Sequence, residues 1–112
     1  MKITQQTHGQ VTVIGPHGPL TSDELAGVRL ALDKAAAARA MRVVLSMANV
    51  PFVDSAGIEM LLELSGNQAL AMKRVKLAAL SDCTRDALDV TDVLSRLDVY
   101  RTVDDAIQSC RR

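Results

Sequence analysis

The chain of 112 residues and 12.0 kDa is predicted to form one domain over residues 1–112. Its 13 basic and 13 acidic side chains give a formal net charge of zero, which argues against nucleic-acid binding because that function needs an excess of basic residues. The single Phe, the single Tyr and the absence of Trp argue against base-stacking platforms and aromatic ligand cages, while a 48% apolar content is enough for an aliphatic core.

Neither a membrane span nor an export signal is visible in the sequence. No uninterrupted apolar run exceeds four residues, whereas a membrane helix needs about 20 and the core of a signal peptide about 7 to 15. We therefore expect a cytoplasmic protein that is not inserted in a membrane. Cys83 and Cys110 are expected to be free thiols, and because two thiols cannot form a structural zinc site alone, no metal or other cofactor is expected.

The first predicted element is a β-hairpin. Apolar and polar residues alternate over 3–6 and again over 11–13, on either side of the short turn His8-Gly9-Gln10. The segment from Gly15 to Pro19 is predicted to interrupt regular structure. A helix then follows its N-cap Thr21, the first residue of the capping box Thr21-Ser22-Asp23-Glu24. Its apolar stripe runs toward residue 40 and includes Leu25, Val28, Leu32 and Ala35.

Short strands alternate with helices in the middle of the chain. Val43 to Met47 is apolar on both faces, as is typical of a central strand covered by helices. A second amphipathic helix is predicted to begin near Ala56 and to carry its apolar stripe to Ala69. Residues 75–80 form a second predicted strand, and the basic cluster Lys73, Arg74 and Lys76 is predicted to be a solvated surface.

The last third of the chain repeats this alternation. Ser81 or Asp82 is predicted to cap a short helix that runs through Leu88. Val99 and Tyr100 form the last predicted strand. A terminal helix is predicted to begin at the cap Thr102 and to carry Ala106 and Ile107.

This order of elements predicts an α/β fold, because strands that alternate with helices favour right-handed crossovers and parallel pairing. We expect a mixed, mostly parallel sheet of four to five strands, with an N-terminal antiparallel hairpin and about four helices. Binding sites in such sheets lie beyond the carboxyl ends of the strands, where loops lead into helices. Two turns are predicted to occupy this position, Gly18 to Thr21 and Pro51 to Gly57.

The second of these turns carries a carboxylate and a hydroxyl at a helix start. Asp54 or Ser55 is suited to cap the helix, because the first N–H groups of a helix lack partners and carry partial positive charge. Alternatively, Ser55 is exposed at the rim and accepts a phosphate, which would add about 1.5 to 2 negative charges beside Asp54. The residue types leave both roles open for Ser55.

The block Val53-Asp54-Ser55-Ala56-Gly57-Ile58, preceded by the strand from Val43 to Met47 and followed by Leu61 and Leu62, resembles the signature of STAS domains. This family is named after sulfate transporters and anti-sigma-factor antagonists. The resemblance covers nearly the whole chain, because residues 75–80, 94–100 and 102–107 fall where the family places its later strands and last helix. It implies the STAS fold and a protein-interaction switch that is not an enzyme.

In bacterial anti-sigma-factor antagonists, the serine of this block is phosphorylated by a partner that is both a serine kinase and an anti-sigma factor. That partner binds the ATP, and the unphosphorylated antagonist binds the partner and frees a sigma factor. The resemblance implies that Ser55 is the phosphorylation site, that Asp54 shapes the helix start and that Gly57 allows a close backbone approach. The implied partner-binding residues are Gly18, Thr21, Asp54, Ser55, Ala56, Gly57 and Ile58.

Two further functions are considered. One is a non-phosphorylated STAS subunit of a lipid or anion transporter or of a stress-sensing complex. The other is a serine hydrolase, which has little support because Val53 stands where the pattern Gly-x-Ser-x-Gly requires its first glycine. The only histidines, His8 and His17, precede Ser55, and nothing in the sequence indicates that either is placed as its base.

Overall fold

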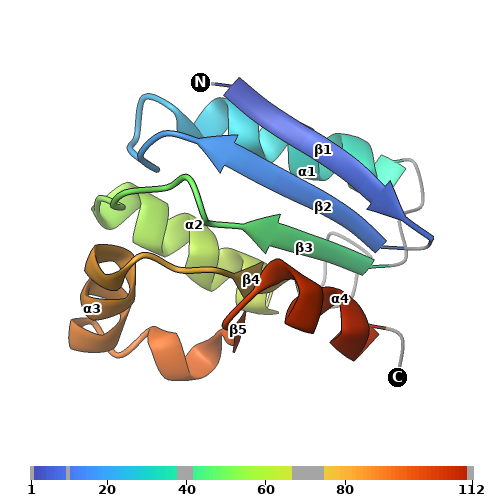
Figure 1. Ribbon diagram of the computed structural model, residues 1–112. Coiled ribbons are helices and arrows are strands. Elements are labelled where there is room, and N and C mark those ends of the chain that lie inside the picture. The colour runs from blue at the N-terminus through green and yellow to red at the C-terminus, as the bar shows by residue number, and fades with distance from the viewer. Residues whose placement is uncertain (1, 10, 38–41, 67–74, 111–112) are drawn as a thin grey trace.

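The computed structural model describes residues 2–9, 11–37, 42–66 and 75–110 (Figure 1). The strands are β1 (Lys2–His8), β2 (Val11–His17), β3 (Arg42–Ser46), β4 (Lys76–Ala78) and β5 (Asp98–Tyr100). The helices are α1 (Leu25–Ala37), α2 (Ser55–Gly66), α3 (Asp82–Val90) and α4 (Val103–Cys110), with a short 3-10 helix, η2, at Leu94–Arg96.

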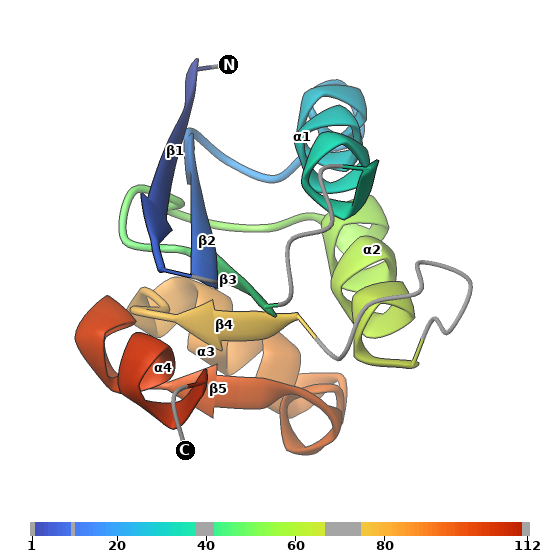
Figure 2. The same cartoon turned by 90° about the vertical axis from the view of Figure 1, so that its right-hand side faces the viewer.

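The five strands form one mixed sheet in the order β1-β2-β3-β4-β5. β1 runs antiparallel to β2, whereas the pairs β2-β3, β3-β4 and β4-β5 are parallel. Helices α1 and α2 lie on one face of the sheet and α4 lies on the other (Figure 2). This arrangement confirms the predicted α/β class, with the N-terminal hairpin at the edge of a mostly parallel sheet.

Each face of the sheet has its own core, because successive side chains of a strand point to opposite faces. The larger core is shared by α1, α2 and α3 and includes Ile14, Val28, Leu45, Met60, Leu61, Leu77 and Leu88. The smaller core lies under α4 and comprises Val11, Val13, Val44, Ala78, Ala106 and Ile107. β3 contributes to both cores, which is why its centre is apolar without alternation.

The first part of the predicted break at Gly15 to Pro19 is wrong, because β2 continues through Gly15 and Pro16 to His17. β2 pairs with β1 over its whole length but with β3 only from Val11 to Ile14. Pro16 therefore lies where β3 is no longer a neighbour, a position at which a strand tolerates the missing N–H of proline.

Helix α1 begins later than predicted. Residues 22–24 form a turn, and the helix starts at Leu25 instead of directly after a cap at Thr21. Thr21 contributes through its backbone, since its carbonyl accepts a hydrogen bond from the N–H of Glu24 at 2.8 Å. The predicted apolar stripe is nevertheless buried, at Leu25, Val28, Leu32 and Ala35.

The predicted caps of the last two helices are confirmed. The Ser81 hydroxyl accepts the N–H of Thr84 in the first turn of α3. The Thr102 hydroxyl accepts the N–H of Asp105 in the first turn of α4. The strand predicted over residues 75–80 is shorter than expected, since β4 covers only 76–78.

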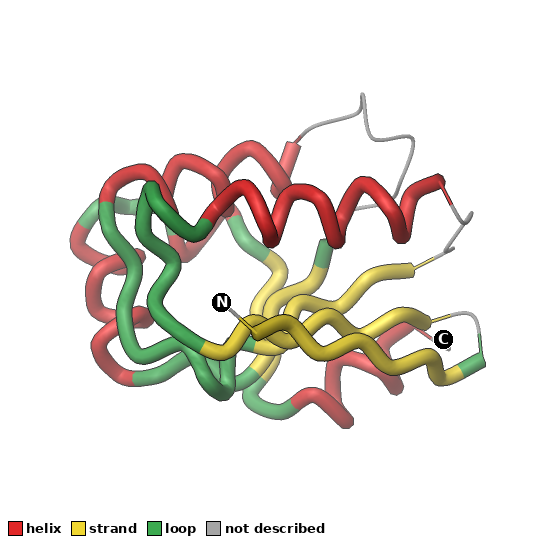
Figure 3. The backbone as a smooth tube through the Cα atoms, turned by 90° about the horizontal axis from the view of Figure 1, so that it is seen from above, coloured by secondary structure: helices red, strands yellow, loops and turns green. Residues whose placement is uncertain are grey.

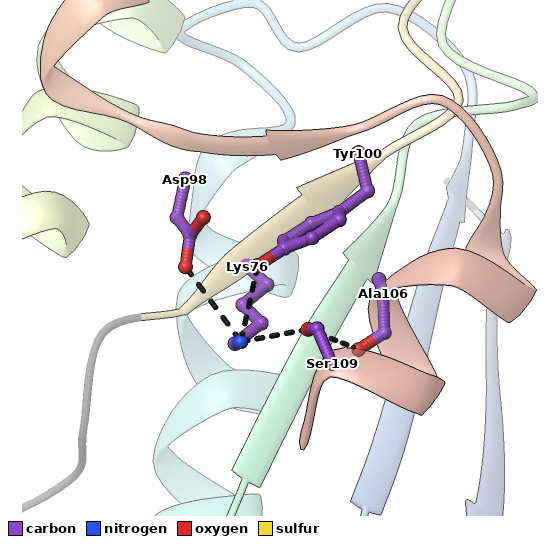
Figure 4. Close-up of polar contacts among 5 residues, drawn as sticks. All are labelled: Lys76, Asp98, Tyr100, Ala106 and Ser109. Carbon is purple, nitrogen blue, oxygen red and sulfur yellow. Dashed lines mark hydrogen bonds and ion pairs between the residues drawn. The ribbon is translucent and has the colours of Figure 1, made fainter. Parts of the chain in front are cut away.

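Lys76 does not belong to a solvated surface, which corrects the prediction for this residue. Its side chain is 15% exposed, and its ammonium donates to Ser109 Oγ at 2.7 Å and to the Tyr100 hydroxyl at 3.3 Å (Figure 4). An ion pair to Asp98 Oδ2 at 3.7 Å adds a negative charge beside these two hydrogen bonds. The ammonium therefore links β4, β5 and the last turn of α4.

Some sequence predictions fall on segments outside the described residues. These are the end of the first helix near residue 40, the end of the second at Ala69, and the basic residues Lys73 and Arg74.

Candidate functional site

The loops that follow β2 and β3 meet beyond the carboxyl ends of these strands, as predicted. Figure 3 shows the connecting loops gathered at this end of the molecule. The two site loops, residues 18–24 and 47–54, are joined by three backbone hydrogen bonds: Gly18 N–H to Asn49 O at 3.0 Å, Leu20 N–H to Phe52 O at 3.1 Å, and Asp54 N–H to Leu20 O at 3.1 Å. Because Leu20 and Val53 also form a parallel bridge, the site loops constitute one backbone unit.

Two glycines permit this close contact between the site loops. Gly18 has a φ of +146°, a conformation that residues with a side chain rarely adopt. Gly57 is buried in the first turn of α2, where a Cβ would collide with the carbonyl of Leu20. The close approach that Gly57 permits is therefore that of the Leu20 backbone.

Asp54 is the residue whose side chain caps α2. Its Oδ1 accepts the N–H of Gly57 at 2.8 Å, the usual bond from an N-cap to the third residue of a helix. Its Oδ2 accepts the N–H of Ser22 at 2.9 Å and so reaches the other site loop. The hydrogen bonds from Gly57 and then Ser22 lower the pKa of Asp54, because they stabilise its charged form. One carboxylate therefore holds both the start of α2 and the segment before α1.

Ser55 is the first residue of α2, and its side chain is exposed. Its hydroxyl forms no hydrogen bond with any part of the chain that the structure describes, so the capping role belongs to its neighbour. The helix start places partial positive charge near this hydroxyl, while the Asp54 carboxylate lies one residue away. Ser55 thus presents an exposed hydroxyl that stabilises none of these residues by hydrogen bonding.

The other predicted site residues lie around Ser55 but are less exposed. Gly18, Thr21 and Asp54 are half-buried in the site loops. Ala56 and Ile58 are also half-buried and pack against the larger core. The fold therefore brings the predicted set together at one end of the sheet, with Ser55 as its exposed member.

Within the described ranges, neither histidine forms a hydrogen bond with Ser55. His8 pairs with Val11 at the amino end of β2, and its ring contacts Gln6, whereas His17 ends β2. Neither is hydrogen-bonded to the Ser55 hydroxyl, so the nucleophile and base of a serine hydrolase are not assembled from these residues. The same part of the chain contains no group of three His, Cys, Asp or Glu side chains placed to hold a metal.

Two features of the site are not predicted from the sequence. The first is the contact of Asp54 with the backbone N–H of Ser22, which has no side-chain signature. The second is Phe52, whose side chain is 45% exposed although it is the only phenylalanine in the chain. Its place in the loop after Pro51, outside any apolar period, is the signal that could have indicated its exposure.

A model of the STAS domain family matches residues 2–106. The chain belongs to the STAS domain family. The fold of this STAS domain is similar to that of an anti-sigma factor antagonist from Mycobacterium paratuberculosis, with 21% sequence identity and a TM-score of 0.82 over 99% of this chain and 94% of that one. A search of curated proteins finds no match.

Two other solved structures show the range of proteins that share this STAS fold. The Bacillus cell fate determinant SpoIIAA in its phosphorylated form is 19% identical, with a TM-score of 0.67 over 97% of this chain and 99% of that one. A sulfate transporter family protein from Wolinella succinogenes is 20% identical, with a TM-score of 0.73 over 95% of this chain and 88% of that one. At these identities the likeness shows the fold alone. Among the described helices, none is long and apolar enough to cross a membrane.

Proposed function

We propose that this STAS domain is an anti-sigma-factor antagonist, a protein-interaction switch that binds an anti-sigma factor with serine kinase activity and is controlled by phosphorylation of Ser55. The observation that carries the proposal is the exposed Ser55 hydroxyl directly after the Asp54 cap. The family match and the likeness to an anti-sigma factor antagonist and to phosphorylated SpoIIAA support it. In this function the chain itself catalyses no reaction, and the partner binds the ATP.

Phosphorylation of Ser55 is expected to change the surface more than the fold. The phosphate adds about 1.5 to 2 negative charges, which are attracted by the start of α2 and repelled by Asp54. These two effects oppose each other within the chain. Glu59 lies one helical turn beyond Ser55 and is exposed. Its negative charge would repel a phosphate on Ser55, and it cannot form an ion pair with that phosphate. A docked partner therefore meets most of the new charge.

Mass spectrometry after incubation with candidate anti-sigma factor kinases and ATP tests the proposal. The wild-type chain is expected to gain about 80 Da, the mass of one phosphoryl group, and Ser55→Ala is expected to gain nothing. Ser22→Ala is the matched control, because it removes another exposed hydroxyl near Asp54 but keeps the backbone N–H that Asp54 binds. Ser55→Asp is expected to bind the kinase more weakly than the wild type does. Phosphorylation at a different residue, or normal binding by Ser55→Asp, contradicts the proposal.

A STAS subunit of a transporter or stress-sensing complex is the second candidate, supported by the likeness to a sulfate transporter family protein. In that function the chain docks on other subunits and Ser55 need not be phosphorylated. Genes for a permease and an ATPase beside the gene of this chain would favour it. So would equal co-purification of the permease with the wild type and with Ser55→Asp.

A further inference from the structure

Three large apolar side chains are exposed among the described residues: Leu30 at 55%, Phe52 at 45% and Val90 at 86%. Single exposed apolar residues are ordinary on protein surfaces, so exposure alone says little. Phe52 differs from the other two in its place, because it lies in a site loop three residues before Ser55. Leu30 lies on α1 and Val90 ends α3.

The backbone that carries Phe52 is fixed on both sides. Its own carbonyl accepts the N–H of Leu20, and the next residue, Val53, forms the bridge to Leu20 and packs against the larger core. Before it, Val50 is buried in the same core. The carbonyl of Pro51 accepts a hydrogen bond from Ser81 Oγ at 3.1 Å, which ties the loop to the start of α3. The ring is therefore presented by a backbone that is held from two directions.

The apolar residues on either side of Phe52 supply the core, so an exposed ring at this position adds little to the fold. Aromatic side chains contribute strongly to protein interfaces, because they bury a large area while only two χ angles become fixed. A backbone that is already ordered also reduces the entropy lost on binding. These properties match those of an interface anchor.

We propose that Phe52 is the apolar anchor of the partner interface, and that its ring enters an apolar pocket on the kinase that phosphorylates Ser55. The inference rests on the proposed function and adds to it a division of roles between two nearby residues. Phe52 provides much of the affinity in the unphosphorylated state, and Ser55 carries the signal that ends the complex. The pocket lies beside the kinase site that receives the Ser55 hydroxyl, since Phe52 and Ser55 are three residues apart.

Calorimetric titration with the kinase that modifies Ser55, loaded with ADP, tests the anchor. Phe52→Ala is expected to weaken binding about 30-fold, the loss typical of an interface hot spot. Leu30→Ala and Val90→Ala are matched controls, because they shorten apolar side chains that are at least as exposed but lie outside the site loops. Each control is expected to change the affinity less than about threefold.

The outcomes separate the anchor from the proposed function. If Ser55 is phosphorylated but Phe52→Ala binds as tightly as the two controls, the anchor is wrong and the phosphorylation switch stands. If no kinase binds the chain and modifies Ser55, both are wrong. Thermal unfolding checks that Phe52→Ala is folded. Should it be unstable, Phe52→Leu and Phe52→Asn replace it: affinity lost in the asparagine variant and largely kept in the leucine variant supports the anchor, because only leucine can still fill an apolar pocket, and equal affinity in both overturns it.

Discussion

Asp54 and Lys76 are two charged side chains that each join segments distant in sequence, but their partners differ in kind. Asp54 accepts backbone N–H groups, from Gly57 in α2 and from Ser22 in the first site loop. Lys76 contacts side chains, namely those of Asp98, Tyr100 and Ser109 (Figure 4). The Asp54 contacts need only one particular side chain, whereas the Lys76 contacts need four. The contacts of Lys76 can therefore be disrupted at more positions than the side-chain hydrogen bonds of Asp54.

The largest effect is expected at Gly57, where the backbone unit around Asp54 leaves no space for a side chain. Gly57→Ala places a Cβ against the Leu20 carbonyl, and that carbonyl also accepts the N–H of Asp54. Urea unfolding should show a loss of about 2 to 3 kcal/mol in the free energy of unfolding, as for other overpacked sites. Gly27→Ala is the control, because a Cβ there meets only Ile3 Cδ1 at 3.6 Å and the helix gains up to about 1 kcal/mol. Equal effects of the two variants would contradict the tight contact.

Removal of the Lys76 side chain should have the next largest effect. Lys76→Ala leaves Ser109 and Tyr100 without their ammonium donor, and we expect a loss of about 1.5 kcal/mol in the free energy of unfolding. Amide hydrogen exchange should increase in α4 and stay unchanged in the site loops. Arg29→Ala is the control: it breaks the ion pair with Glu63, in which both side chains are about half exposed, and should cost less than about 0.5 kcal/mol. Faster exchange throughout the chain in Lys76→Ala would contradict this prediction, because it would show that the loss of the contact destabilises the whole fold and not α4 alone.

The pH dependence of stability should show how much the Asp54 carboxylate stabilises the fold. The folded state lowers the pKa of Asp54 from 3.8, so its ionised form stabilises the fold above that pH and the contribution is lost as the pH falls through the folded pKa. Asp54→Asn should therefore be less stable than the wild type at pH 7, and the difference should shrink below about pH 4. Ser22→Ala is the control, because it keeps the backbone N–H that Asp54 binds and should keep the acid dependence of the wild type. An unchanged difference between Asp54→Asn and the wild type from pH 7 to pH 3 would exclude this role of the carboxylate.

The smallest effect on the fold is expected at Ser55 itself. Because Asp54 provides the cap, Ser55→Ala should change the free energy of unfolding by no more than about 0.5 kcal/mol in either direction. Thermal unfolding of the variant and the wild type measures this difference. A loss as large as that of Lys76→Ala would mean that the hydroxyl has a structural role.

The sequence predicts well those features that depend on local pattern. The apolar stripe from Leu25 to Ala35, the central strand at 43–47 and the caps Ser81 and Thr102 follow from spacing and from residue type. The α/β class follows from their order. These predictions succeed because burial and capping act over a few neighbouring residues.

Features that depend on contacts between distant segments could not be predicted. Pro16 reads as a strand breaker, but it is tolerated because β3 pairs with only part of β2. Lys76 reads as a surface residue, but Tyr100 and Ser109 provide acceptors from 24 and 33 residues away. Within the site, the sequence identifies Asp54 and Ser55 but leaves the cap undecided. The structure adds a contact that local pattern does not contain, from the N–H of Ser22, 32 residues before Asp54, to the same carboxylate that caps the helix.

Because aromatic residues are scarce, each of the two compared regions contains a single aromatic side chain that spectroscopy can follow. Phe52 in a site loop is the only phenylalanine, so fluorinated phenylalanine would give one ¹⁹F resonance, located at the proposed interface. Tyr100 beside Lys76 is the only tyrosine, and the chain has no Trp, so intrinsic fluorescence arises from the contact that holds α4. Events at the site loops and at α4 can therefore be followed separately in the unmutated chain.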